Sequence, residues 1–92
     1  MPSPKRFNLR GKRWDFQIVD RLPDASHGEI DPPDRPKKQI RVARNQTPID
    51  LLDTVIHECL HAAIPDLSED AVSETATDLA KVLHRLGCRV HL

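Results

Sequence analysis

Two consecutive helix patterns with marked ends fill the second half of this 92-residue chain and constrain its fold more than any other feature. The first has Thr47 at the N-cap, where a hydroxyl accepts a hydrogen bond from a free backbone N–H, and Pro48 at the first helical position. Apolar residues recur at helical spacing until Pro65, which cannot continue a helix. A helix over residues 48–64 is therefore predicted.

The second pattern begins after Ser68, another N-cap residue, and Gly87 ends it. Glu69 and Asp70 lie in its first turn, where negative charge is favoured by the helix dipole. The expected apolar stripe of this helix consists of Val72, Ala76, Leu79, Leu83 and Leu86.

The first half of the chain reads as strands and loops. Residues 14–19 and 38–43 alternate apolar and polar positions, as strands do. The stretch from Leu22 to Pro36 between them is rich in proline and reads as a loop, across which the two strands could pair antiparallel. The sequence therefore predicts an α+β fold with a small antiparallel sheet of two or three strands and two main helices.

The length and composition set the scale of the domain. With 92 residues the chain forms one domain with a modest core, and a 3% aromatic content makes that core aliphatic. Residues 1–13 are polar and basic, so we expect a partly flexible N-terminal segment followed by a single domain over 14–92.

The charges are balanced overall but unevenly placed. Basic residues cluster in residues 5–13 and 35–44, which fits either a solvated surface or a face that meets nucleic acid or an acidic partner. Two cysteines do not make a disulfide framework, and no apolar run suits a signal sequence or a membrane span. We expect a cytoplasmic protein without a membrane partner. The oligomeric state stays open.

The segment His57-Glu58-Cys59-Leu60-His61 carries the chemistry. Two histidines four residues apart on a helix project from one face, so both rings can hold one zinc ion. Glu58 follows His57 and points to one side, where its carboxylate can reach a zinc-bound water as a general base. An H-E-x-x-H match also occurs by chance, but here it lies in a well-marked helix with both histidines off the apolar stripe.

A catalytic zinc needs a third protein ligand, and the second predicted helix offers two candidates. If its apolar stripe packs on the first helix, Glu69 is better aimed; if the stripe packs on the sheet or on a partner subunit, Glu74 faces the histidines. We predict Glu74 as the third ligand, with Glu69 as the alternative. Weaker candidates are His84, His91, Asp66 and Asp70.

The segment Val72–Leu79 resembles the third-ligand helix of the thermolysin-like peptidases, the gluzincins. In that family a Glu ligand is followed four residues later by an Asp that supports a metal-binding histidine, as Glu74 is followed by Asp78 here. Residues 56–86, about a third of the chain, also resemble small phage-type and SprT- or ImmA-like H-E-x-x-H proteins. The resemblance implies a minimal zincin-like domain and an extended peptide substrate paired with the strand Gln39–Ala43.

The function expected from these residues is zinc-dependent hydrolysis of peptide bonds, with Zn2+ held by His57, His61 and Glu74. Glu58 would take a proton from the zinc-bound water, and the substrate would be a peptide or protein. The alternative is a non-catalytic zinc-binding module with a structural or regulatory role, or a protein associated with nucleic acid. The chain has no Tyr, so an oxyanion donor must be Arg, His or backbone.

Overall fold

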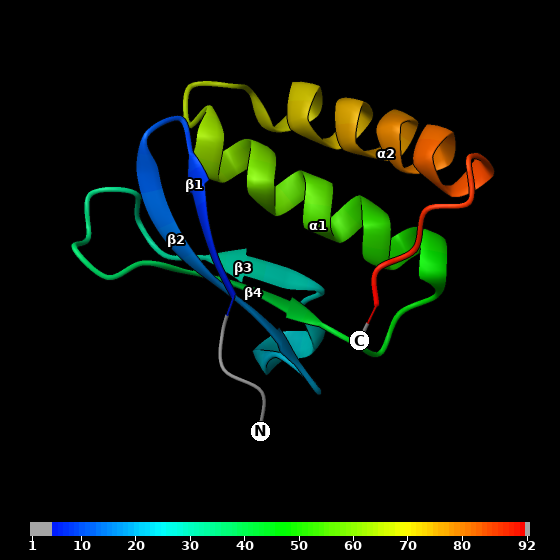
Figure 1. Ribbon diagram of the computed structural model, residues 1–92, viewed down its shortest axis with the longest axis horizontal. Helices are drawn as coiled ribbons and strands as arrows, with labels where there is room; N and C mark the ends of the chain where they lie inside the picture. The colour runs from blue at the N-terminus through cyan, green and yellow to red at the C-terminus, as the bar shows by residue number, and fades with distance from the viewer. Residues whose placement is uncertain (1–4, 92) are drawn as a thin grey trace.

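The structure, a computed structural model, describes residues 5–91. Its elements in chain order are the strands β1 (Lys5–Leu9) and β2 (Lys12–Val19), a 3-10 turn η1 (Pro23–Ala25), the strands β3 (Gly28–Ile30) and β4 (Gln39–Ala43), and the helices α1 (Pro48–Ala63) and α2 (Glu69–Arg85). Helix α1 lies between the sheet and α2, so the molecule has three layers (Figure 1). Among the described elements, α2 packs against α1 alone.

The sheet confirms the α+β class but differs from the expected sheet. It has four strands rather than two or three, in the order β1-β2-β4-β3, and β2 pairs parallel with β4 rather than antiparallel. The reason is β3, which lies inside the expected proline-rich loop and pairs antiparallel with β4. This additional reversal of the chain returns β4 in the direction of β2 and inserts it between β2 and β3.

The basic N-terminal segment is part of the sheet from Lys5 onward. β1 pairs antiparallel with β2 through a two-residue turn at Arg10 and Gly11, whose φ angles are 50° and 81°. Such positive angles suit a tight hairpin turn and favour glycine. The expected domain boundary after residue 13 therefore falls inside a strand pair, while residues 1–4 lie outside the described part.

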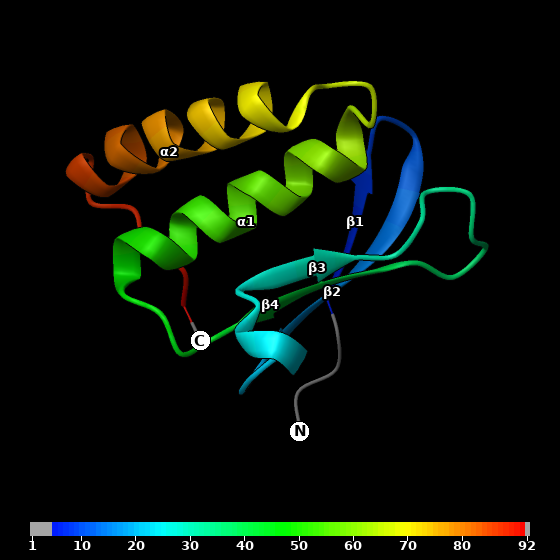
Figure 2. The ribbon, with the colours of Figure 1, turned by 180° about the vertical axis from the view of Figure 1, so that it is seen from behind.

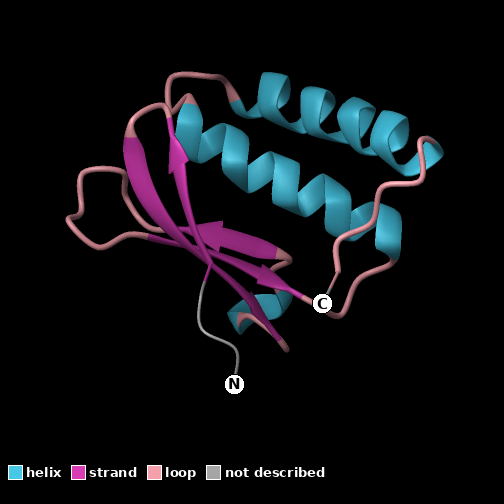
Figure 3. Ribbon diagram, viewed as in Figure 1, coloured by secondary structure: helices cyan, strands magenta, loops and turns pink. Residues whose placement is uncertain are grey.

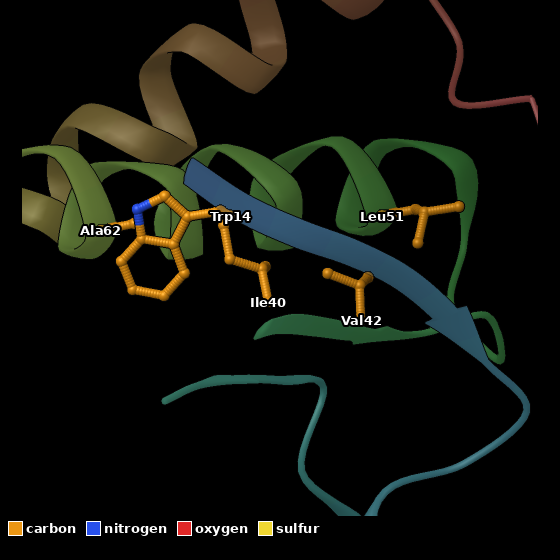
Figure 4. Close-up of a cluster of buried hydrophobic side chains, with 5 residues drawn as sticks. All are labelled: Trp14, Ile40, Val42, Leu51 and Ala62. Atoms are coloured by element: carbon orange, nitrogen blue, oxygen red, sulfur yellow. The ribbon is translucent and has the colours of Figure 1, made fainter. Parts of the chain in front are cut away.

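The core lies between the sheet and α1. Trp14, Ile40 and Val42 point from the sheet toward Leu51 and Ala62 of α1 (Figure 4). Trp14 is fully buried and is the largest side chain of this cluster, so the expectation of a purely aliphatic core is wrong.

Both helices begin as predicted. The Thr47 hydroxyl accepts a hydrogen bond from the Asp50 N–H at 3.3 Å, and the Ser68 hydroxyl accepts one from the Ala71 N–H at 3.1 Å. Gly87 follows α2 with a φ of 92°, a conformation that glycine adopts without strain. Within residues 5–91, no helix has the length and apolar character needed to cross a membrane.

The face with which α2 packs agrees with the predicted stripe at Val72 and Ala76 and differs from it farther along the helix. Val72, Ala76 and Ala80 are buried, whereas Leu79 and Leu86 are 43% and 73% exposed. Because α2 rests on α1 and on no strand, only a narrow face is covered, and two alanines let the helices approach closely. Of the remaining residues of the expected stripe, Leu83 is half-buried, whereas Leu79 and Leu86 are exposed.

Candidate metal centre

The candidate site lies where α1 ends and α2 begins. The connection of residues 64–68 folds α2 back along α1, so the last turns of α1 lie beside the first turn of α2 (Figure 2). His57 and His61 lie one turn apart on α1, and Glu69 is the first residue of α2. The turn thus brings a carboxylate from the second helix to two imidazoles on the first.

The three side chains converge on one point. The Glu69 Oε1 atom lies 3.1 Å from His57 Nε2, and its Oε2 atom lies 2.9 Å from His61 Nε2. The two Nε2 atoms are 3.2 Å apart. Ligand atoms at zinc distances of roughly 2.0–2.1 Å stand about 3.3 Å apart at the corners of a tetrahedron. The His57–His61 separation of 3.2 Å therefore suits two ligands of one ion, while the two contacts of Glu69 are made by different oxygens, of which one would act as the ligand.

Hydrogen bonding satisfies this cluster in one arrangement of ring protons, in which each ring donates from Nε2 to a different oxygen of Glu69. Glu69 can accept a hydrogen bond from each ring only if both Nε2 atoms carry hydrogen. The two Nε2–H groups would then stand 3.2 Å apart without a lone pair to share. A divalent cation at the centre would instead meet lone pairs from all three side chains, which is the chemistry zinc prefers.

One side of the cluster is open to solvent. The side chains of His57 and His61 are 26% and 24% exposed, and that of Glu69 is 65% exposed. A site of three protein ligands with an accessible side is the arrangement of a catalytic zinc rather than of a closed structural one.

Glu58 lies inside the protein beside the cluster. Its residue is only 7% exposed, and loss of solvation raises the pKa of its carboxyl, while His57 and His61 act in the opposite direction. A carboxylate with a raised pKa takes up a proton more readily near neutral pH. Glu58 is therefore more easily protonated than an exposed glutamate.

Gly28 at the start of β3 lets the sheet edge approach α1. A Cβ atom at this position would lie 2.7 Å from the Thr54 methyl group and 2.8 Å from a Glu58 carboxylate oxygen. Any larger residue would displace Glu58 or Thr54. Sequence reasoning missed this role, and the only signal was a glycine inside the proline-rich stretch.

Gln46 holds this approach in place and was also missed. Its side-chain amide donates to the carbonyls of His27, at 3.3 Å, and Ala43, at 2.7 Å. Its carbonyl oxygen accepts a hydrogen bond from the Thr54 hydroxyl at 2.7 Å. One side chain therefore ties the start of β3, the end of β4 and helix α1 together.

The third candidate ligand is Glu69 in the structure, and Glu74 is not brought to the histidines. Glu74 and Asp78 are both exposed on α2, and within the described chain neither is joined to His57 by a hydrogen bond or ion pair. The reason is the packing of α2: its narrow buried face rests on α1, which is the arrangement in which Glu69 is the better aimed residue. His84, His91, Asp66 and Asp70 also lie outside the cluster.

Two further residues of α1, Cys59 and Asp53, contribute to packing within the fold. Cys59 is partly buried against the core, and its burial raises the pKa of the thiol. Asp53 accepts a hydrogen bond from the Thr77 hydroxyl of α2 at 2.9 Å. This bond joins the two helices one turn below the histidines.

The comparisons with known proteins give no family. No family model matches the chain, and neither a curated protein nor a solved structure matches it. What is said of the function below rests on the geometry of this site and on the sequence motif.

Proposed function

We propose that this chain is a zinc-dependent metallopeptidase that hydrolyses peptide bonds with the help of Glu58. The observation that carries the proposal is the convergence of His57, His61 and Glu69, whose ligand atoms all lie within 4.8 Å of one another. The proposal keeps the predicted histidine ligands and general base, and takes Glu69 in place of Glu74 as the third ligand.

The residues of the chain have separate tasks in this mechanism. His57, His61 and Glu69 hold the ion, which when bound acidifies a coordinated water and polarises the substrate carbonyl. Glu58 accepts the proton of the attacking water and passes it to the leaving amine. Its burial keeps bulk water away from the carboxylate during this transfer.

The sheet topology shows that β4, the strand expected to pair with a peptide substrate, is not an edge strand. β4 has β2 on one side and β3 on the other, so Gln39–Ala43 has no edge for a peptide. The edge next to α1 belongs to β3, whose neighbours His27 and Asp31 bond to β4. In an antiparallel pair alternate residues face the other side, so the backbone groups of Gly28 and Ile30 point outward, where they can pair with an extended peptide.

The resemblance to gluzincins and to small phage-type H-E-x-x-H proteins remains part of this proposal. The Glu-x-x-x-Asp pattern of Glu74 and Asp78 does not support it, since both side chains are exposed on α2. The support comes from the H-E-x-x-H helix and from a glutamate on the next helix. A cytoplasmic location belongs to the proposal as well, because Cys59 and Cys88 are free.

A non-catalytic zinc module is the competing function, and one observation favours it. The candidate ion would join α1 to α2, and α1 is the only element of residues 5–91 against which α2 packs. Zinc could therefore serve the stability of this small domain alone. The basic residues of 5–13 and 35–44 remain the predicted places for nucleic-acid contact.

Replacement of Glu58 by Gln separates the two functions. With zinc bound, we expect the wild type to cleave a mixed peptide library, and Glu58→Gln to lose about 10²–10⁴-fold in rate while its zinc affinity stays within a small factor. Glu74→Gln is the matched control, since Glu74 is exposed and outside the cluster. It should keep both properties.

Two outcomes would contradict the proposal. Equal rates in the wild type and Glu58→Gln would remove Glu58 from the mechanism. Zinc-loaded wild type that cleaves no member of the library, together with an apo form that unfolds, would favour the structural module.

A further inference from the structure

The β1–β2 hairpin carries a dense group of positive charges. Residues 5–13 hold five basic side chains and no acidic one, although the net charge of the whole chain is zero. All five basic residues are exposed: Lys5, Arg6, Arg10, Lys12 and Arg13. A local excess of positive charge on a protein of balanced charge attracts polyanions to that part of its surface.

The fold uses these charges only in part. Arg6 pairs with Asp15 at 3.2 Å, and the Arg10 guanidinium donates to the Ala63 carbonyl at 3.2 Å. The other basic side chains of the hairpin form no ion pair within residues 5–91: Lys5, Lys12 and Arg13. These three charges can therefore serve an anion from outside the described chain.

An exposed aromatic ring lies among these charges. Of the three residues Phe7, Trp14 and Phe16, only Phe7 is exposed, at 51%. Its ring meets the Phe16 ring edge to face, with the centroids 6.2 Å apart and an interplanar angle of 85°. This contact holds the Phe7 ring in place and leaves half of the residue open, so a planar group can stack there.

The strand register sets two of the lysines on the same face as the Phe7 ring. Residues two apart on a strand share a face, so Lys5 lies on the side of Phe7. Phe7 pairs with Trp14, and Lys12 precedes Trp14 by two residues, so Lys12 shares this face as well. The ring thus has one ammonium group toward each end of β1, which suits a base with a phosphate on either side.

The parallel pairing of β2 with β4 adds the second basic stretch to this surface. Both strands begin at the same end of the sheet, so the β3–β4 loop lies at the end where the hairpin turns (Figure 3). The Asp15 N–H donates to the Lys38 carbonyl at 3.0 Å, which holds the end of the loop beside β2. The loop carries Arg35 and Lys37 against one exposed acid, Asp34.

We propose that the β1–β2 hairpin binds single-stranded nucleic acid, with a base stacked on Phe7 and phosphates beside Lys5, Lys12 and Arg13. The charge selects a polyanion, and the exposed ring selects one with planar groups, which an acidic peptide lacks. A duplex keeps its bases stacked on one another and offers none to Phe7. Basic residues alone would protect an edge strand from aggregation, but an exposed ring works against that purpose.

This surface is separate from the metal centre. In the sheet order β1-β2-β4-β3, β1 is the edge opposite to β3, and it is β3 that approaches Glu58. Nucleic acid bound to the hairpin would therefore leave the candidate metal centre and the free edge of β3 accessible. The inference goes beyond the proposed hydrolysis and is tested without it.

The test is the affinity of the full chain for a fluorescently labelled oligothymidylate, measured by fluorescence anisotropy over a salt series. We expect wild type to bind this single strand more tightly than a duplex of the same length. Each phosphate contact with a single strand contributes about 0.7 to the slope of log affinity against log salt. Arg13→Gln should therefore weaken binding and reduce the slope by about 0.7. Lys81→Gln, the same loss of charge on α2, should change neither.

Replacement of Phe7 separates stacking from charge. Phe7→Leu keeps an apolar side chain but removes the ring, so it should weaken binding roughly 5- to 100-fold at an unchanged salt slope. Phe7→Trp should bind at least as tightly as wild type, because it restores a ring. Leu86→Ala, a change of an exposed apolar residue on another element, is the control, and circular dichroism of each variant verifies the fold.

Three results would overturn the proposal. The first is no binding of the oligonucleotide at low salt, and the second is equal or tighter binding of the duplex. The third is wild-type affinity in Phe7→Leu, which would show a general attraction of polyanions. No peptide is cleaved in these measurements, so each result is independent of the proposed hydrolysis.

Discussion

Two polar clusters in this protein differ in their composition. One pairs an arginine with two carboxylates, and the other sets two histidines beside one carboxylate. On the sheet face away from α1, the Arg41 guanidinium donates to Glu29 at 2.7 Å, to Asp31 at 2.7 Å and to Gln39 at 2.8 Å. We call these four residues the sheet cluster. In the metal cluster of His57, His61 and Glu69, two ring nitrogens share one carboxylate and face each other.

In the sheet cluster, Arg41 donates hydrogen bonds to both carboxylates and to the Gln39 side chain. The hydrogen bond from Arg41 is the main reason that the pKa of the Asp31 carboxyl lies below its ordinary value, and the same bond raises the pKa of Arg41. The backbone N–H of Gln39 adds a further bond to Asp31 at 2.9 Å. A charge network with matched donors and acceptors stabilises the fold and leaves no place for a ligand.

The metal cluster teaches the opposite lesson. Its two ring nitrogens, 3.2 Å apart, and a carboxylate from the next helix are groups that zinc binds, and one side of the cluster is open to solvent. Imidazole and carboxylate groups that converge at a solvent-accessible point suit a metal ion, whereas carboxylates already paired with an arginine point to structure. The predictions that follow from this comparison are given in order of decreasing expected effect on stability.

The largest expected effect is stabilisation by zinc. At a free zinc concentration of about 1,000 times the dissociation constant, binding to the folded state adds about 4 kcal/mol to the free energy of unfolding. We expect zinc to raise the melting temperature of wild type and of Arg41→Met by similar amounts, and not to raise that of His61→Ala. A zinc-dependent rise that survives in His61→Ala would show that the ion binds elsewhere.

Removal of the sheet cluster's cation should be the next largest effect. Arg41→Met leaves Asp31, whose side chain is only 14% exposed, without its main partner, and should lower the free energy of unfolding by about 2 kcal/mol in urea denaturation. The control is Arg44→Met, which breaks an exposed ion pair with Asp20 and should cost less than about 1 kcal/mol. If both variants lose the same free energy of unfolding, the sheet cluster does not stabilise the fold more than an exposed ion pair does.

The pH dependence of the sheet cluster should be smaller still. Because the folded pKa of Asp31 lies below its ordinary value of 3.8, its contribution to stability is complete above pH 3.8. It is lost as the pH falls below 3.8 through the folded pKa. Asp31→Asn should therefore lose less stability than wild type on acidification through this range, as measured by urea denaturation at each pH. Parallel losses in the two proteins would contradict this.

The parts of the structure that depend on neighbours in sequence were predictable. Thr47 and Ser68 mark the two helix starts through their own hydroxyls, and the spacing of His57 and His61 sets both rings on one face. These relations span three or four residues, so helix geometry alone decides them.

The parts that depend on distant packing were not predictable in the same way. β3 is three residues long and follows proline and glycine, so no alternation marks it, and without it the direction of β4 relative to β2 cannot be inferred. The choice between Glu69 and Glu74 depends on which face of α2 meets α1. Val72 and Ala76 of the predicted stripe lie in that face together with Ala80, whereas Leu79 and Leu86, which were also predicted to lie in it, are exposed.

The most direct test of the metal centre is the zinc affinity of three proteins, measured by competition with a chromogenic chelator: wild type, Glu69→Gln and Glu74→Gln. Loss of a ligand should weaken binding by more than the roughly 10–100-fold that loss of an outer partner causes, so Glu69→Gln should fall beyond that range while Glu74→Gln binds as wild type does. Wild-type affinity in Glu69→Gln, with a large loss in Glu74→Gln, would contradict the convergence of His57, His61 and Glu69 on one ion.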